Sequence, residues 1–205
     1  MTVERALDVS NLPDAAPGTR APVWWGQIGM MLIETVVFAI IIASYFYIRL
    51  GFSVWPPPDI APPELWWPTA NLILILLSCI PMFIGGKAID EGRIGTAAFW
   101  LGLNIIMALG FLAIRIIEFN LFNFKWSTDV YGSLIWILVG LHTMHAIADT
   151  TESIVLFGIM VSGRMGAKQQ IAAKLDGIYW YWVAAMWVVL YILIYIYPSI
   201  RLGML

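Results

Sequence analysis

The sequence predicts an all-α integral membrane protein, a bundle of five transmembrane helices. Of its 205 residues, 61% are hydrophobic and only 12% are charged, whereas an average soluble domain has roughly 25% charged residues. Five apolar segments are long enough to cross a hydrocarbon core of about 30 Å, which takes about 20 helical residues. The segments expected to span the membrane are 25–50, 68–88, 95–121, 130–161 and 178–199.

A polar tail, residues 1–23, precedes the membrane domain, which is expected to occupy residues 24–205. The tail contains Pro13, Pro17 and Pro22 and lacks the apolar core of a signal peptide. We therefore expect it to stay attached to the mature chain.

The first span carries one acidic residue, Glu34, about ten residues from its start and so near the middle of the membrane. An ionisable side chain there costs on the order of 2.5–3.5 kcal/mol unless it has a partner. Two interpretations stay open. Glu34 is either a neutral carboxyl hydrogen-bonded to a neighbouring helix or a group that exchanges protons.

The connection between the first two spans is rich in proline and tryptophan. Residues 55–67 have the sequence WPPPDIAPPELWW, and the fixed backbone angle of proline favours an extended conformation over a helix. Its tryptophans are expected at the level of the lipid headgroups.

The third span contains Arg115 and Glu118, which are spaced i,i+3 and can pair on one helix face. Asn104 falls on nearly the same face. The spacing predicts an internal ion pair, which places charge in the membrane without requiring reactivity.

The fourth span carries both histidines of the chain and two carboxylates on one face. At about 100° per residue, His142, His145, Asp149 and Glu152 fall within roughly 80° of one another. Such a stripe must face protein, water or headgroups rather than lipid tails. It is either a satisfied polar seam or a proton-handling or metal-binding site. We expect it to form one buried network with Glu34, which lies at similar depth.

The residue types present argue against a cofactor. Two histidines at i,i+3 on one helix cannot ligate opposite faces of one haem, and a ferritin-like site needs Glu-x-x-His on two helices. Cys79 is the only cysteine, which excludes a cysteine-based metal site. The sequence therefore predicts no metal, no bound cofactor and no catalytic residue in this chain. Its small net charge of −2 predicts no nucleic-acid partner.

The basic residues at the ends of the spans are divided unequally between the two sides. One side has Arg5, Arg20, Lys87, Arg93, Arg164, Lys168 and Lys174. The other side has only Arg49, Lys125 and Arg201. The positive-inside rule then puts the N-terminus in the cytoplasm and the C-terminus outside. At the inner side, Trp24, Trp25, Arg93 and Arg164 are the candidates for contact with lipid headgroups.

Five motifs follow one another in an order that resembles a known family. They are MLIETVVFAIIIASYF with Glu34, PTANLILILLS, GFLAIRIIEF with Glu118, YGSLIWILVGLHTMHAIAD, and LDGIYWYWVAAMWVVLYILIY. Together they are similar to subunit III of the haem–copper terminal oxidases (cytochrome c oxidase subunit III), in its five-helix bacterial form.

The resemblance implies a cofactor-free subunit in the bacterial inner membrane. This subunit would pack against catalytic subunit I and subunit II, where the haem and copper lie. It would also bind phospholipid and support proton uptake in aerobic electron transport. The last helix departs from the family pattern, because Tyr181 and Ala184 stand where the family usually has His and Asp. The resemblance therefore does not extend the family's proton-collecting role to this helix, and the stripe from His142 to Glu152 is the candidate that would compensate.

Two other functions remain open at this point. One is the equivalent subunit of a quinol oxidase or an accessory protein of a nitric-oxide reductase. The other is a small proton-coupled carrier that works alone. The odd number of spans and the lack of an internal repeat argue against a carrier, because many carriers are built from two repeats.

Overall fold

A computed structural model describes residues 21–58, 60 and 64–201 of the chain. The expected N-terminal tail therefore lies almost wholly outside the described residues. In chain order the helices are α1 (Pro22–Arg49), α2 (Trp66–Asp90), α3 (Ile94–Leu121), α4 (Val130–Val161), α5 (Ala167–Tyr191), the π-helical turn η2 (Ile192–Ile196) and α6 (Tyr197–Arg201).

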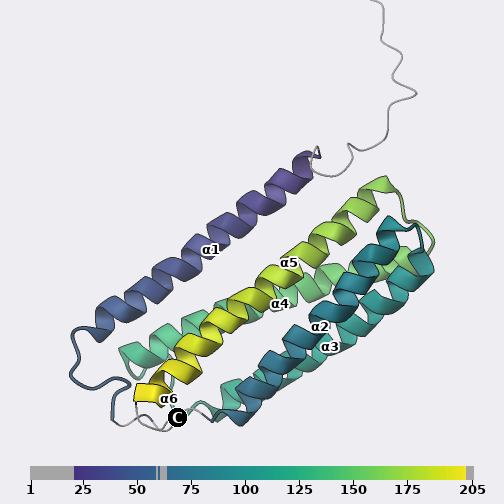
Figure 1. The fold of residues 1–205 in the computed structure, drawn as a ribbon. Helices are drawn as coiled ribbons and strands as arrows, with labels where there is room; N and C mark the ends of the chain where they lie inside the picture. Colours follow the sequence, from purple (N-terminus) through teal and green to yellow (C-terminus); the bar gives the residue numbers. More distant parts are fainter. Residues whose placement is uncertain (1–20, 59, 61–63, 202–205) are drawn as a thin grey trace, which may run out of the picture.

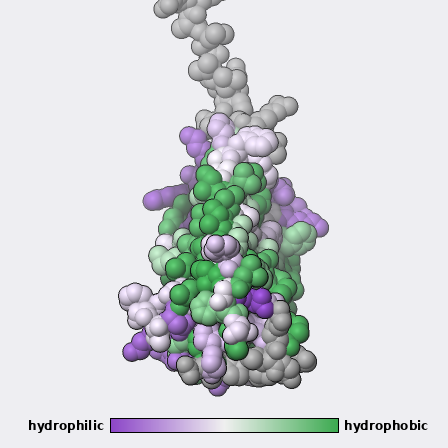
Figure 2. Space-filling view, turned by 90° about the vertical axis from the view of Figure 1, so that its left-hand side faces the viewer, coloured by the Kyte–Doolittle hydropathy of each residue, from purple (hydrophilic) through white to green (hydrophobic). Residues whose placement is uncertain are grey.

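The described residues contain helices and no strand, so the predicted all-α class is confirmed. Five helical stretches in this part of the chain are long and apolar enough to cross a membrane, as predicted. Figure 2 shows one face of the molecule, on which mostly hydrophobic residues cover the middle and hydrophilic residues gather above and below them. This distribution suits a protein that spans a bilayer.

The fifth membrane helix differs most from its expected bounds. It begins at Ala167 rather than at Ile178, and it continues through η2 into α6. Its first turns carry polar and charged residues, which resemble a loop in sequence. The Gln169 side chain nevertheless accepts a hydrogen bond from the Gly166 N–H at 3.1 Å, which caps the helix start.

Helices α2, α3, α4 and α5 form a closed four-helix bundle, in which α2 contacts both α3 and α5, and α4 contacts both α3 and α5. Helix α1 lies outside this bundle and packs mainly against α4 and α5 (Figure 1). Only two α1 side chains within Pro22–Arg49, Phe38 and Tyr45, are fully buried. Most of the surface of α1 is thus open to lipid or to another protein.

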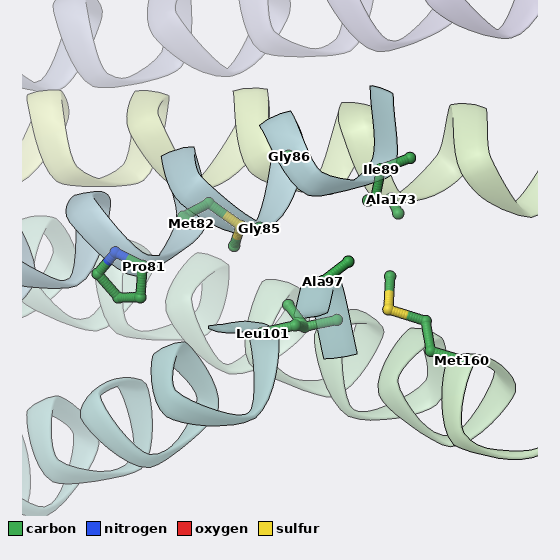
Figure 3. A pocket seen from close by; sticks show the side chains of 9 residues that line it. All are labelled: Pro81, Met82, Gly85, Gly86, Ile89, Ala97, Leu101, Met160 and Ala173. Carbon is green, nitrogen blue, oxygen red and sulfur yellow. The ribbon is translucent and has the colours of Figure 1, made fainter. Parts of the chain in front are cut away.

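Close packing of α2 on α3 depends on small residues. A Cβ at Gly85 would lie 3.4 Å from Cβ of Trp100 and 3.6 Å from the Ala97 carbonyl oxygen. Next to this contact lies a cavity of about 10 Å³ lined by apolar side chains of all four bundle helices (Figure 3). An apolar cavity of this size stays dry. On the other side of α2, Trp180 of α5 donates a hydrogen bond from Nε1 to Ser78 Oγ at 2.8 Å.

The start of α4 is held by a side-chain cap and a close backbone approach. The Gly132 N–H donates to Asp129 Oδ1 at 2.6 Å, which satisfies a backbone donor at the helix start. A Cβ at Gly132 would lie only 2.6 Å from the carbonyl oxygen of Lys125. Position 132 therefore has no room for a side chain.

We expect Gly132→Ala to destabilise the protein by about 1–3 kcal/mol, because the overpacked backbone must shift. Gly140→Ala, on the same helix, is the control, since a Cβ there meets nothing within 4 Å. The control change should be neutral or slightly stabilising. Unfolding in mixed micelles titrated with sodium dodecyl sulfate would measure both free energies. Equal effects of the two changes would show that the contact at Gly132 is unimportant.

Candidate functional site

Glu34 of α1 contacts both helices on which α1 packs. Its Oε1 lies 3.5 Å from Nε2 of His145 on α4. Its Oε2 accepts a hydrogen bond from the Tyr179 hydroxyl of α5 at 2.9 Å. The side chains of Glu34 and His145 are 22% and 12% exposed, so this contact is partly shielded. We call the three residues the Glu34 network.

The hydrogen bonds of His145 define which of its ring nitrogens faces Glu34. Nδ1 lies 2.6 Å from the carbonyl oxygen of Leu141, and a carbonyl oxygen only accepts. Nδ1 therefore carries a hydrogen, and Nε2 is the nitrogen that can accept a proton from the Glu34 carboxyl or return one to it. This arrangement is a carboxyl–imidazole pair with a phenol as third partner.

Aromatic residues of α5 and α1 hold the Glu34 network in place. The Trp182 Nε1–H donates to Thr35 Oγ1 at 2.8 Å, and the rings of Tyr179 and Trp182 stack with centroids 5.3 Å apart. The His145 ring lies against Trp182 at 5.4 Å and against Phe38 at 5.5 Å. These contacts limit the rotation of the groups that face Glu34.

Three carboxylates of α4 and α5 come together next to this network. Asp149, Glu152 and Asp176 each offer a carboxylate oxygen, and these oxygens all lie within 4.8 Å of one another. Asp149 and Asp176 are buried, whereas Glu152 is exposed. Ser153 donates its hydroxyl to the Asp176 carboxylate, at 2.9 and 3.0 Å from the two oxygens. We call the three carboxylates the acidic cluster.

The structure does not bring His142 into the Glu34 network, contrary to the single network expected from the sequence. His142 Nε2 lies 2.9 Å from the Val183 carbonyl oxygen, and its ring packs on Trp187 and Phe111 at 5.1 and 6.0 Å. His142 and His145 differ by about 60° around the helix. That angle is enough for His145 to face α1 while His142 faces the interior of the bundle.

Arg115 and Glu118 form an ion pair inside the bundle, with side chains 0% and 2% exposed. The guanidinium of Arg115 also lies over the Trp187 ring, 3.6 Å from its centroid, in a cation–π contact. Trp187 thus connects the ion pair to His142. These side chains are at most 3% exposed, so the group lies in the interior of the bundle.

The four lipid-contact candidates lie at the end of the bundle where α1 and α5 begin, which we call the inner end. Trp24 lines a pocket of about 340 Å³, together with Lys87 of α2 and Lys174 and Tyr181 of α5.

Trp25 is 66% exposed. Arg93 is exposed in the turn after α2, where its Nε donates to Glu91 Oε2 at 2.7 Å. Arg164 is exposed in the turn after α4.

Sequence reasoning missed Asp176 and Tyr179, the two residues that α5 contributes to the site. Both lie on one face at i,i+3, and that spacing was the available signal. The expected start of the span at Ile178 concealed it, because it left Asp176 in a loop. Lys87 and Lys174 were placed on the inner side from the sequence but were not named as lipid-contact candidates, although both line the inner-end pocket.

Comparisons with known proteins match most of the chain to one group of proteins. A family model described as "Cytochrome c oxidase subunit III" matches residues 16–199. A "Cytochrome c oxidase subunit 3" of Synechocystis sp. is 25% identical over 173 residues, which cover 84% of this chain and 74% of the relative. The protein of that name from Thermostichus vulcanus is 23% identical over 172 residues, 83% and 85% of the two chains. A "Probable cytochrome c oxidase subunit 3" of Rickettsia bellii is 28% identical over 219 aligned positions, 96% and 75% of the two chains.

Proposed function

The chain belongs to the cytochrome c oxidase subunit III family, and we propose that it acts in the oxidase as a non-catalytic subunit. In this role it stabilises the catalytic subunit, binds phospholipid and supports proton uptake. Haem and copper would belong to subunits I and II, and this chain would hold no redox cofactor of its own. The observation that carries the proposal is the Glu34 network, a carboxyl–imidazole pair that joins α1 to the bundle.

The proton-uptake role is supported by the graded depth of the polar groups. At 1.5 Å rise per residue, Glu152 and Asp176 lie about 14 Å from the inner ends of their helices, and Asp149 and Glu34 about 18 Å. His145 lies deeper, at about 24 Å. Exposed Glu152 thus begins a series of proton-binding groups that ends at the Glu34 network.

The lipid-binding role is supported by the pocket at the inner end. Lys87 and Lys174 supply positive charge, and Trp24, Phe83 and Tyr181 supply apolar or aromatic surface. Lys174 already pairs with Asp90, which leaves Lys87 as the group best suited to a phosphate. Such a combination of charge and aromatic surface fits a headgroup and the start of its acyl chains.

We place the protein in a bacterial inner membrane, with the inner end of the bundle facing the cytoplasm. The basis is the positive-inside rule, because seven of the 11 basic residues lie on that side. The N-terminus would then be cytoplasmic and the C-terminus periplasmic.

We expect Glu34→Ala or His145→Ala to loosen the subunit or slow turnover while leaving the haem spectra intact. Leaving a hydrogen-bonding group without its partner costs about 1–3 kcal/mol, which corresponds to roughly a 5- to 150-fold change in an equilibrium constant. Visible spectra, subunit retention and oxygen consumption would be measured on one preparation of the complex. Glu91→Ala, which removes an exposed carboxylate at the inner end, is the control.

Loss of the haem signals with the mutated subunit still bound would overturn the non-catalytic assignment. Unchanged retention and unchanged turnover in both variants would overturn the role of the Glu34 network. The electron donor is a separate question, and assays of the purified complex with cytochrome c and with a quinol would answer it.

A further inference from the structure

We propose that the acidic cluster of Asp149, Glu152 and Asp176 binds one divalent cation of the hard, oxygen-preferring class, of which Ca²⁺ fits best. The pattern of histidines and cysteine in the sequence predicted no metal site, and that prediction did not consider Asp176. Helix packing unites the three carboxylates. The proposal concerns a redox-inert ion. It bears on the proposed function, because an ion bound here would occupy the carboxylates with which the proposed proton path begins. Ion binding and turnover are therefore measured separately.

The spacing of the three carboxylate oxygens suits this ion. Ca²⁺ binds oxygen ligands at about 2.3–2.6 Å, so two ligands on opposite sides of it lie at most about 5.2 Å apart. The oxygens of the cluster lie within 4.8 Å of one another. Mg²⁺ holds its ligands at about 2.0–2.1 Å and demands stricter geometry, so it tolerates a smaller spread.

A second observation points to a missing positive partner, independently of the spacing. Asp149 is only 1% exposed, and neither of its carboxylate oxygens has a hydrogen-bond partner among the described residues. A buried carboxylate without a partner is strongly unfavourable. By contrast, Asp176 receives the Ser153 hydroxyl. The side chain of Asp149 is directed toward the other two carboxylates, where a cation would satisfy it.

Basic side chains of the described residues do not fill this role. The carboxylates that form ion pairs there are Glu34, Asp90, Glu91 and Glu118. None of them belongs to the acidic cluster. Lys174 is only two residues before Asp176, yet it pairs with Asp90 of α2. Two buried carboxylates and a third close to them therefore lie together without a cationic partner from residues 21–58, 60 and 64–201.

Access and orientation also suit an exchangeable ion. Glu152 is exposed on the surface of this chain, so its carboxylate lies at the open side of the cluster, next to the two buried ones. Ser153 holds the Asp176 carboxylate through its hydroxyl. Residues that hydrogen-bond a ligand in this way typically change metal affinity roughly 10–100-fold when they are removed.

The test uses the whole oxidase complex, stripped of divalent ions with a chelator. Tb³⁺ replaces Ca²⁺ in oxygen sites, and tryptophans close to a site sensitise its luminescence. We expect the number of Tb³⁺ sites that Ca²⁺ displaces to fall by one per complex in Asp149→Asn and in Asp176→Asn. Ser153→Ala should retain the site with an affinity lower by roughly 10–100-fold. Asp90→Asn and Glu91→Gln, which change acidic residues outside the cluster, are the controls.

An unchanged number of Ca²⁺-displaceable sites in the two aspartate variants would overturn the proposal. A second result would also overturn the proposal. It is an infrared band of a protonated carboxylic acid that the unmutated complex keeps in saturating Ca²⁺ and that Asp149→Asn lacks, because the carboxyls would then share a proton and not a cation. Subunit retention is measured on every variant. If the subunit with Asp149→Asn or Asp176→Asn is lost from the complex, Glu152→Gln takes their place, because it leaves the two buried carboxylates intact. Glu152→Gln should still weaken Ca²⁺ binding. An unchanged Ca²⁺ affinity of this variant would contradict the proposal.

Discussion

Arg115→Ala is expected to destabilise the protein by about 3–5 kcal/mol, because it leaves the buried Glu118 carboxylate without its partner. Arg115 is 0% exposed, and its guanidinium also packs on Trp187, so packing is lost together with charge. Arg93→Ala is the matched control, since it breaks an ion pair whose side chains are 57% and 42% exposed. Such surface pairs contribute about 0–1 kcal/mol. The free energy of unfolding in mixed micelles measures both.

The double variant Arg115→Met with Glu118→Met separates charge from packing. If the uncompensated carboxylate causes the loss, this variant should be more stable than Arg115→Ala alone, because two apolar groups replace a buried ion pair at little cost. A double variant that is as unstable as the single one would show that packing around Trp187 dominates. Equal effects of Arg115→Ala and Arg93→Ala would contradict the burial argument itself.

Phe38→Ala is expected to weaken the attachment of α1 by about 3 kcal/mol, near the lower end of the range for a buried phenylalanine. Phe38 is 0% exposed and its ring contacts His145 and Trp182. It is one of only two fully buried side chains within Pro22–Arg49. Its removal opens a cavity at the place where α1 meets both α4 and α5.

Hydrogen exchange followed by mass spectrometry reads this attachment directly. Backbone amides of α1 should exchange faster in Phe38→Ala, whereas those of α2 and α3 should not change. Val37→Ala, at a neighbouring side chain that is 42% exposed, is the control and should behave like the wild type. Faster exchange in all helices would mean that α1 unfolds with the bundle and not separately from it.

The number of membrane helices was predictable because a bilayer leaves few choices. A backbone in hydrocarbon must satisfy its hydrogen bonds internally, so apolar segments of sufficient length become helices. The Arg115–Glu118 pair was also predictable, since its two partners lie one helical turn apart. The start of α5 was not predictable from the sequence, because Lys174 and Asp176 make its first turns resemble a loop. In the structure these turns are helical, and packing on α2 and α4 buries one face of them.

The sequence by itself showed most of the ionisable residues inside the membrane, because such a group in an apolar segment is visible without a structure. Asp176 was the exception, since its position before the expected span assigned it to a loop. Only the tertiary structure decided how they are partnered. Glu34 meets Tyr179 across 145 residues of chain, and Asp149 meets Asp176 across two helices. His142 and His145 lie on one stripe, yet His142 contacts Val183 of α5 inside the bundle and His145 contacts Glu34 of α1. Contacts between distant residues depend on the rotation of each helix about its axis, and packing of the whole bundle sets that rotation.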